Sequence, residues 1–356
     1  MMRKLVALFT VLALLFCFAG CSGSDTDTDT STDAGLGTNT ETNAGLGTSS
    51  TKAPTNTESV GSASQSTSSK QTIVFPDPVT GTYNGKTVTI SYRAITDIEY
   101  VASEAYCYFI NGYATWFNPH RSNTYNSDGW SIVDFDGNSV FVPWPESVDD
   151  LSISSFDQNG IAVLRTQKEF GKKSEYTFIN TKGETVGTAT EKDYDDRVAL
   201  SDKIDYWGQE ENSDGSMKIS QKKDGGISVV DADGKTLFDL PDEFDRAVFR
   251  SDKMVIACDF PTVPWSVYDN TGKRINQDTF SIIGNMENGL CPIINHKTND
   301  DGTNTAYLGL MGENGEIVIP PTLETDSYSN VGIFFSEGHI ITEYKGLIAI
   351  LQVTVE

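Results

Sequence analysis

Two acidic motifs come closest, in residue type and spacing, to a chemical site in this chain. Asp134-Phe-Asp-Gly137 and Asp231-Ala-Asp-Gly234 each place two carboxylates at alternate positions before a glycine. Such spacing is typical of the first half of a calcium-binding loop, which a glutamate further along completes. It is equally typical of a β-turn, whose first side chain accepts backbone hydrogen bonds and whose glycine adopts a positive φ. The two interpretations make different demands on the residue before the glycine.

Five copies of this motif recur along the chain, with their glycines 38 to 51 residues apart. The first position is Asp or Asn in four of the five copies, whereas the residue before the glycine varies freely. A calcium loop would need an oxygen ligand at the variable position. The recurrence therefore favours a hairpin turn, and Ca²⁺ is an open but not a favoured partner. The predicted structural turn residues are Asp134, Gly137, Asn180, Gly183, Asp231, Gly234, Asp269, Gly272 and Gly315.

The residues on both sides of each turn alternate between apolar and polar, which predicts one strand leading in and one leading out. A second pattern, Gly or Asp followed by an apolar run, predicts a further strand before each hairpin. The sequence therefore predicts an all-β repeat array of about six three-stranded units without a long amphipathic helix. Such an array forms either a propeller-like ring or an open β-solenoid. The second pattern begins at Asn111, Asn159, Ser201, Ser251, Asn288 and Glu337.

Together the two patterns resemble the WG-repeat family of bacterial exported proteins. Phe335-Ser-Glu-Gly-His-Ile340 and Glu287-Asn-Gly-Leu-Cys-Pro292 match the first half of the family's repeat. Trp130-Ser-Ile-Val-Asp-Phe-Asp-Gly137 and Gly315-Glu-Ile-Val-Ile-Pro320 match its second half. The resemblance covers about residues 96–356. It implies a repeat architecture with a binding or scaffolding role, and it implies no catalytic residues.

The N-terminal segment predicts export and a lipid anchor. Met1-Met-Arg-Lys4 precedes an apolar run, and Phe18-Ala-Gly-Cys21 resembles the lipobox of bacterial lipoproteins, whose cysteine is diacylated after cleavage. Two acyl chains anchor a protein stably to a bilayer. We therefore expect Cys21 to hold the protein to the cell membrane, extracytoplasmic and surface-exposed. The predicted order is signal peptide 1–20, lipidated cysteine and disordered Ser/Thr/Asp/Gly-rich linker 21–71, opening β-hairpin 72–95 and repeat domain 96–356.

The charge of the chain restricts its partners. Against 26 basic residues stand 50 acidic ones, which gives a formal net charge of −24 at pH 7. Nucleic acids and other polyanions are bound by clusters of Lys and Arg. The composition therefore argues against nucleic acid and leaves a cationic partner, a divalent metal ion or a neutral glycan open. The expected ligand is a protein, a peptide or a neutral glycan.

No pattern of nucleophile, base or metal ligands marks an active site. Histidines are few and lie in different predicted units, whereas catalysis needs such groups within mutual reach. The cysteines after Cys21 form no CxxC motif and no Cys/His cluster, although a single Cys258–Cys291 disulfide stays open. We therefore expect no catalytic residue, no metal site and no cofactor.

Aromatic side chains gather in the first predicted unit. Exposed aromatic rings on a β scaffold stack against sugars or proline-rich peptides. The sequence therefore predicts a cell-surface binding or interaction module without catalytic activity. The alternatives are a surface glycan- or peptide-acting hydrolase and a purely structural surface spacer. The predicted ligand-binding residues are Trp116, His120, Tyr125, Trp144 and Asp136, the last because it belongs to no repeated pattern.

Overall fold

A computed structural model gives the structure of the repeat domain. The predicted signal peptide, Cys21 and the linker 21–71 lie outside the described residues, as do His120 and Tyr125. Within the described part of the chain, no helix has the length and apolar character needed to cross a membrane. The described residues are 74–99, 108–118, 128–201, 204, 208–223, 225–259, 264–275, 277–300, 302–326 and 334–356.

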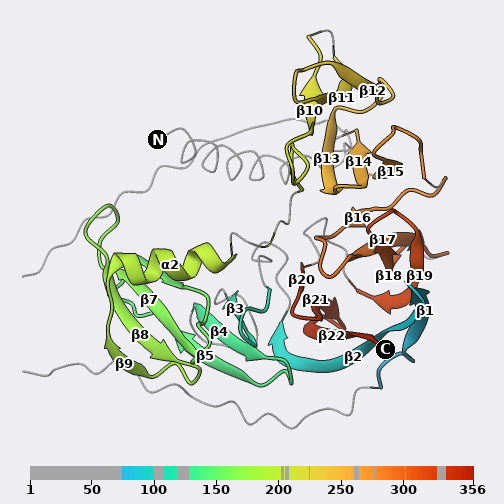
Figure 1. The fold of residues 1–356 in the computed structure, drawn as a ribbon. Helices are drawn as coiled ribbons and strands as arrows, with labels where there is room; N and C mark the ends of the chain where they lie inside the picture. The colour runs from blue at the N-terminus through green and yellow to red at the C-terminus, as the bar shows by residue number, and fades with distance from the viewer. Residues whose placement is uncertain are drawn as a thin grey trace, which may run out of the picture. The chain divides into compact units, whose positions relative to one another are not determined.

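The described strands form six small antiparallel sheets (Figure 1), which confirms the prediction of an all-β repeat array of about six units. Three sheets have the expected three strands, and the others have four or five. Sheet I contains β3 (Tyr113–Asn118), β4 (Gly129–Asp134) and β5 (Ser139–Pro143); sheet II contains β6 (Asp150–Ile153), β7 (Ile161–Gln167), β8 (Glu175–Asn180) and β9 (Thr185–Thr188). Sheet III contains β10 (Met217–Gln221), β11 (Ile227–Asp231) and β12 (Thr236–Asp239); sheet IV contains β13 (Arg246–Ser251), β14 (Met254–Cys258) and β15 (Ser266–Asp269). Sheet V contains β16 (Ile282–Ile283), β17 (Leu290–Thr298), β18 (Asn304–Gly312) and β19 (Ile317–Thr325); sheet VI contains β1 (Val79–Tyr83), β2 (Lys86–Glu99), β20 (Phe334–Ser336), β21 (His339–Tyr344) and β22 (Leu347–Val355).

The acidic motif Asp134–Gly137 forms the turn that joins β4 to β5. Asp134 Oδ1 accepts the backbone N–H groups of Asp136 and Asn138, each at 2.9 Å. The Gly137 N–H donates to the Asp134 carbonyl oxygen at 3.0 Å, and Gly137 has a φ of 74°. An aspartate in this position holds the turn closed, while glycine supplies the positive φ at no steric cost. The Asp134 side chain and Gly137 therefore both serve to close the turn.

Three other copies of the turn have the same geometry. The first side chain of each accepts the N–H groups two and four residues further on, and each glycine has a positive φ. In the fifth copy the first residue is Gly312, which has no side chain, and the Glu316 carboxylate accepts the Asn314 N–H instead, at 3.1 Å. The copies with a side-chain acceptor begin at Asn180, Asp231 and Asp269.

Three copies of the second sequence pattern form tight turns that lead directly into a strand. In Asn111-Gly112, Asn288-Gly289 and Glu337-Gly338, both residues have positive φ. Two consecutive positive φ values define the type I′ turn, whose twist matches that of antiparallel strands and which favours Asn-Gly pairs. These turns precede β3, β17 and β21.

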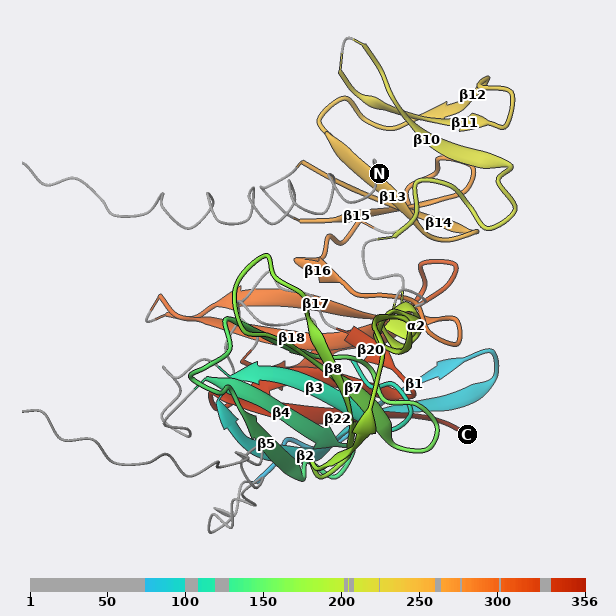
Figure 2. The same ribbon diagram turned by 90° about the vertical axis from the view of Figure 1, so that its left-hand side faces the viewer.

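One copy of the second pattern is wrong as a strand signal, because Ser201 ends a helix. The helix α2 (Glu191–Ser201) follows sheet II and has no buried residue. Its start is capped reciprocally: the Asp193 carboxylate accepts the Thr190 N–H at 2.9 Å, and Thr190 Oγ1 accepts the Asp193 N–H at 3.3 Å. This capping box favours a helix over a strand at this point. Figure 2 shows α2 beside β7.

The two ends of the described chain meet in sheet VI. Strand β2, near the N-terminus, pairs antiparallel with β22, with Ile90 opposite Val353 (Figures 1 and 2). The predicted opening hairpin 72–95 is thus represented by β1 and β2, which extend to Glu99 and complete the last sheet. In an open solenoid the first and last units lie at opposite ends of the array. Sharing one sheet between both ends therefore agrees with the propeller-like alternative.

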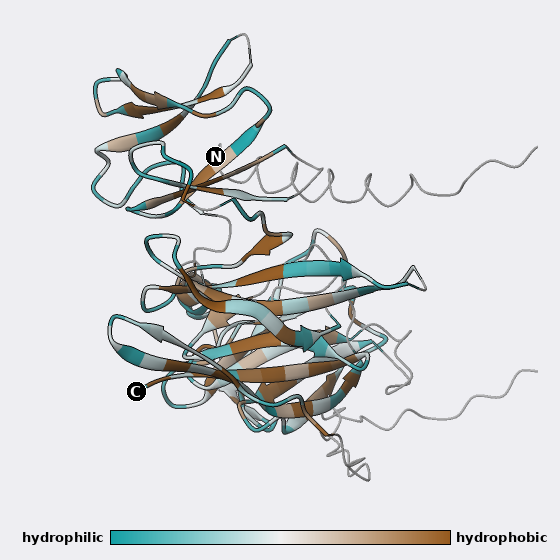
Figure 3. Ribbon diagram, turned by 90° about the vertical axis from the view of Figure 1, so that its right-hand side faces the viewer, coloured by the Kyte–Doolittle hydropathy of each residue, from teal (hydrophilic) through white to brown (hydrophobic). Residues whose placement is uncertain are grey.

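Apolar clusters join the sheets in the spatial order II–I–VI–V–IV–III. Each of the five clusters contains buried side chains from two successive members of this series, so each sheet packs against its neighbours. Figure 3 shows the apolar residues concentrated in the strands and the polar residues in the turns. Among the described residues, no apolar cluster joins sheets II and III. In the sequence, α2 lies between the last strand of sheet II and the first strand of sheet III.

The disulfide that the sequence left open is not formed. Cys258 of β14 and Cys291 of β17 are free and fully buried. Burial raises the pKa of each thiol to about 12. A thiol that stays protonated among apolar side chains packs as a small hydrophobic residue.

Candidate functional site

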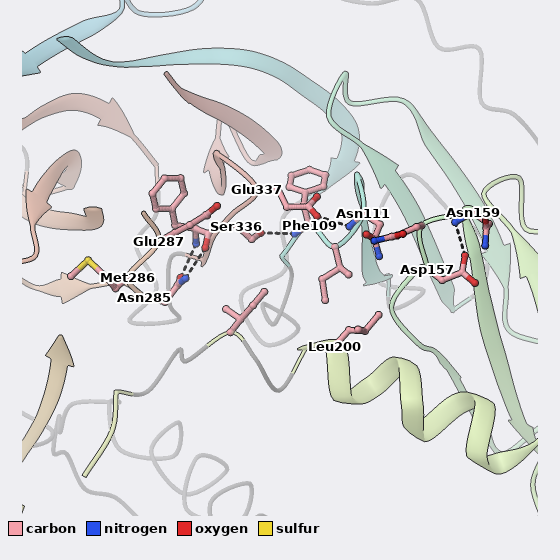
Figure 4. A pocket seen from close by; sticks show the side chains of 14 residues that line it. Phe109, Asn111, Asp157, Asn159, Leu200, Asn285, Met286, Glu287, Ser336 and Glu337 are labelled. Carbon is pink, nitrogen blue, oxygen red and sulfur yellow. Dashed lines mark hydrogen bonds between the residues drawn. The ribbon is translucent and has the colours of Figure 1, made fainter. Parts of the chain in front are cut away.

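A pocket of about 740 Å³ opens among turns that precede strands β3, β7, β17 and β21 (Figure 4). We call it the turn pocket. Sheets I, II, V and VI each contribute one turn, and the end of α2 contributes apolar side chains. Ligand pockets of small molecules have volumes of the same order. The lining residues are Phe109, Ile110, Asn111, Asp157, Gln158, Asn159, Leu200, Ile204, Asn285, Met286, Glu287, Phe335, Ser336 and Glu337.

Hydrogen bonds between sheets fix the turns around the pocket. The Glu337 carboxylate, from sheet VI, accepts the backbone N–H groups of Asn111 and Gly112 in sheet I at 2.6 and 2.8 Å. Ser336 Oγ accepts the Phe109 N–H at 2.7 Å (Figure 4). The Asn111 side chain in turn donates to the Phe156 carbonyl oxygen of sheet II at 2.7 Å. The pocket wall is therefore continuous from sheet VI through sheet I to sheet II.

Sheet V is bound to sheet VI at the same wall. The buried side chain of Asn285 donates to the Phe335 carbonyl oxygen at 2.6 Å and accepts the Phe335 N–H at 2.8 Å. Glu287 Oε1 accepts the Gly338 N–H at 3.2 Å. Satisfied buried polar networks rigidify the structure around them. We conclude that the turn pocket is preformed by side chains that bridge neighbouring sheets.

The pocket is acidic, and its three carboxylates differ in their partners. Asp157 forms an ion pair with Arg197 of α2 at 2.8 Å. Glu337 accepts backbone N–H groups of sheet I with both of its carboxylate oxygens. Glu287 Oε2 is enclosed and has no hydrogen-bond partner among the described residues. Burial raises the pKa of Glu287, against the hydrogen bonds from the Gly338 and Glu337 backbone, and the negative charge of Glu337 adds to the rise.

The described aromatic residues predicted to bind ligand, Trp116 and Trp144, do not line this pocket. Trp116 is only 2% exposed and packs in the apolar cluster between sheets I and VI, so its ring is not available to a ligand. Trp144 is half-buried, and its Nε1 donates to the Val148 carbonyl oxygen at 2.6 Å. Trp130, from the same unit, donates to the Leu151 carbonyl oxygen at 3.0 Å. Both Trp130 and Trp144 pack against the apolar cluster between sheets I and II, so core packing explains their presence.

Asp136 lies on the surface, where it forms an ion pair with Arg93 of β2 at 2.9 Å. The guanidinium of Arg93 lies over the Phe135 ring, 5.7 Å from its centroid, and Phe135 stacks on His339 with ring centroids 3.9 Å apart. The His339 ring donates from Nδ1 to the Glu337 carbonyl oxygen at 2.7 Å, which leaves Nε2 to accept from Arg93 at 3.3 Å. Asp136 thus supports the contact between sheets I and VI.

No metal site is evident in the part of the chain that the structure describes. None of its His, Cys, Asp and Glu side chains form a group of three or more that could hold a metal ion. In the acidic motifs, Asp134 and Asp231 use their carboxylates on backbone N–H groups. The arrangement of these motifs is that of a turn.

Sequence reasoning did not identify the pocket residues as a site. Asn111, Asn159 and Glu337 stand at the start of the second sequence pattern, which served only as a strand signal. The repetition itself could have indicated these residues, because equivalent turns of neighbouring repeats lie on the same side of the array. Polar side chains at such turns, next to a required glycine, mark the surface on which a repeat protein places function.

No protein-family model and no curated protein matches this chain. Solved structures of distant likeness include puromycin hydrolase, with 13% identity over 74% of this chain and 49% of that chain and a TM-score of 0.24. The C-terminal WD40 domain of Sif2 has 10% identity over 74% of this chain and 98% of that domain, with a TM-score of 0.25. A putative TolB from Agrobacterium tumefaciens has 12% identity over 78% of this chain and 99% of that chain, with a TM-score of 0.26. The chain thus spans about half the length of puromycin hydrolase, and its fold class rests on the strand pairings described above.

Proposed function

We propose that the protein is a non-catalytic binding module that takes its ligand in the turn pocket. In this proposal the module is a lipoprotein with divergent WG-type repeats, held on the outer face of the cell membrane by diacylated Cys21. The observation that carries the proposal is the convergence of four equivalent turns on one preformed pocket of about 740 Å³. Pockets that combine apolar walls with a few fixed polar groups are the usual sites of ligand binding.

The lining supports recognition by several kinds of contact. Ile110, Leu200 and Met286 are half-buried apolar side chains that a ligand can cover further. Asn159 adds an exposed amide near the carboxylates described above. The bridging hydrogen bonds hold these groups in place before binding, which lowers the entropy that binding must offset.

A ligand screen with two tryptophan variants tests the proposal. The protein is the mature chain from residue 21 with Cys21→Ala, so that it stays in solution, and the ligands are neutral oligosaccharides, short peptides, alkylamines and Ca²⁺. Leu200→Trp narrows the pocket, whereas Ala199→Trp places the same ring on an exposed neighbouring position of α2. We expect at least one ligand to raise the Tm of the parent and of Ala199→Trp but not of Leu200→Trp.

Three results contradict the proposed function. A ligand that stabilises both tryptophan variants equally binds elsewhere. If no compound changes the Tm of any form, the structural-spacer alternative gains, and turnover of an oligosaccharide or peptide during the screen supports the hydrolase alternative.

A further inference from the structure

We infer that the ligand of the turn pocket carries a positively charged amine on an apolar body, and that the amine pairs with Glu287. This inference rests on the proposed function of the pocket. It concerns the chemical class of the ligand, which the fold alone does not define. A free alkylamine and the side chain of a lysine share this chemistry, and the experiment below distinguishes them.

The charge of the lining selects for a cation. None of the described lining residues is Lys or Arg, whereas three of them are carboxylates. Arg197 balances Asp157. Within the described part of the chain, Glu337 and Glu287 instead accept backbone N–H groups, those of Asn111 and Gly112 for Glu337 and that of Gly338 for Glu287, and neither carboxylate forms an ion pair. An anionic ligand would be repelled here, and a cation would lie near two uncompensated negative charges.

Glu287 provides a specific contact for that cation. Its Oε1 accepts the Gly338 N–H, while Oε2 is enclosed without a partner among the described residues. An enclosed carboxylate oxygen without a donor is costly, and an ammonium group that donates to it forms a charge-assisted hydrogen bond. The last torsion of a glutamate is broad, so the carboxylate can turn Oε2 toward the pocket on binding.

The rest of the pocket favours an organic amine over a metal ion. Ca²⁺ needs six to eight oxygen ligands, and the described residues contain no group of three or more acidic, His or Cys side chains that could hold an ion. Apolar side chains from sheet I, sheet V and α2 line the same pocket. They can cover the hydrocarbon part of a ligand while its amine faces Glu287.

Isothermal titration of the mature chain with Cys21→Ala at pH 8 tests the inference. The probes are hexylammonium, hexanol and hexanoate, which share a hydrocarbon chain and differ in charge. We expect hexylammonium to bind at least about tenfold more tightly than hexanol, and hexanoate not to bind, because hydrogen bonds to charged groups contribute that much or more. The tripeptide Gly-Lys-Gly, capped at both ends, shows whether a lysine side chain is accepted as well as a free amine.

Glu287→Gln is the informative variant, because the amide oxygen can still accept the Gly338 N–H. It should lower the affinity for hexylammonium at least about tenfold and leave the affinity for hexanol unchanged. Asp252→Asn is the matched control: Asp252 also bridges two sheets, by accepting the Ser213 N–H at 2.7 Å, but it lies outside the pocket. Its affinity for hexylammonium should equal that of the parent.

Equal affinities for hexylammonium and hexanol would overturn the inference, as would tight binding of hexylammonium to Glu287→Gln. In either case the proposed function still stands if a ligand of another class stabilises the parent and not Leu200→Trp. If hexylammonium fails to bind and no ligand in the screen is sensitive to Leu200→Trp, both the inference and the proposed function are wrong.

Discussion

Glycines at the repeated turns differ in what surrounds them. Gly137 has a φ of 74°, and a Cβ added there would lie 2.9 Å from Ala94 Cβ and 3.3 Å from the Ile95 carbonyl oxygen of β2. Gly234 has a φ of 82°, but nothing lies within 4 Å of an added Cβ. Gly137 is therefore required both by its backbone conformation and by its contact with the neighbouring sheet.

Alanine substitutions at these two glycines separate strain from packing. We expect Gly234→Ala to lower the free energy of unfolding by about 1 kcal/mol, because a side chain at positive φ is strained. Gly137→Ala should lower it by about 2–4 kcal/mol, because the crowding against Ala94 adds to the same strain. Urea denaturation of both variants measures the difference, and equal losses would contradict the packing between sheets I and VI.

Glu343 of β21 is a carboxylate in an unfavourable place. Burial raises its pKa to about 7, and the nearby charge of Asp326 adds to the rise. The folded protein therefore holds a proton that the unfolded chain releases near pH 4.5, the ordinary value for this group. The destabilisation that results is absent below pH 4.5, grows as the pH rises, and is complete above about pH 7.

Glu343→Gln should remove this destabilisation. We expect the Tm of the variant, relative to the parent, to increase as the pH rises from about 5 to about 8. Glu146→Gln, at an exposed position, serves as the control and should show no such trend. Thermal melts over this range provide the measurement, and a constant difference between Glu343→Gln and the parent would contradict the buried setting of Glu343.

At the scale of elements, sheet VI depends on strands from both ends of the described chain. Strand β2 covers the edge of β22, and it buries Val88, Ile90 and Ile98 completely. An unpaired edge strand exposes N–H and C=O groups that bind other chains. The first strands are therefore part of the last repeat.

Removal of β1 and β2 tests this role. A fragment that begins at residue 100 should lose cooperative unfolding or aggregate, because β22 keeps only β21 of its two partner strands and the clusters on both faces of sheet VI lose their β2 side chains. A fragment that begins at residue 74 should melt like the mature chain. Circular dichroism melts compare them, and an unchanged Tm for the shorter fragment would contradict the shared sheet.

At the scale of the whole molecule, local chemistry was predictable and long-range packing was not. The turns at Gly137, Gly183, Gly234 and Gly272 could be predicted, because an Asp or Asn acceptor and a glycine of positive φ form each turn within a few residues of the sequence. The pairing of Ile90 with Val353 joins segments far apart in sequence, which turn and strand patterns do not encode. A segment inserted between repeats, such as α2, also cannot be predicted from the repeat pattern, because it has no counterpart in the other repeats.

The candidate site was missed for a related physical reason. An aromatic residue at strand spacing, such as Trp116, suits a core and an exposed ligand-binding face equally well in sequence. Only the packing of sheet I on sheet VI places it inside. Conversely, Asn111 and Glu287 become neighbours of one pocket only when the sheets that carry them are assembled.

The anchor proposed for the whole protein has its own test. Cys21→Ala should abolish incorporation of labelled palmitate and move the protein from the membrane fraction to the soluble fraction, because no diacylated residue remains. Cys17→Ala, within the predicted signal peptide, is the control and should leave both unchanged. Palmitate labelling of Cys21→Ala at the parent level would show that the lipid is attached elsewhere or that the lipobox prediction is wrong.

The most direct test of the central claim is an NMR titration that locates the ligand. Spectra of the mature chain with Cys21→Ala are recorded with hexylammonium, a neutral oligosaccharide and capped Gly-Lys-Gly. We expect the signals shifted by a bound probe to include the side-chain amides of Asn111, Asn159 and Asn285, while the indole N–H signals of Trp130 and Trp144 stay unchanged. Shifts confined to the two indoles would place binding at the aromatic residues of sheet I and contradict a site in the turn pocket.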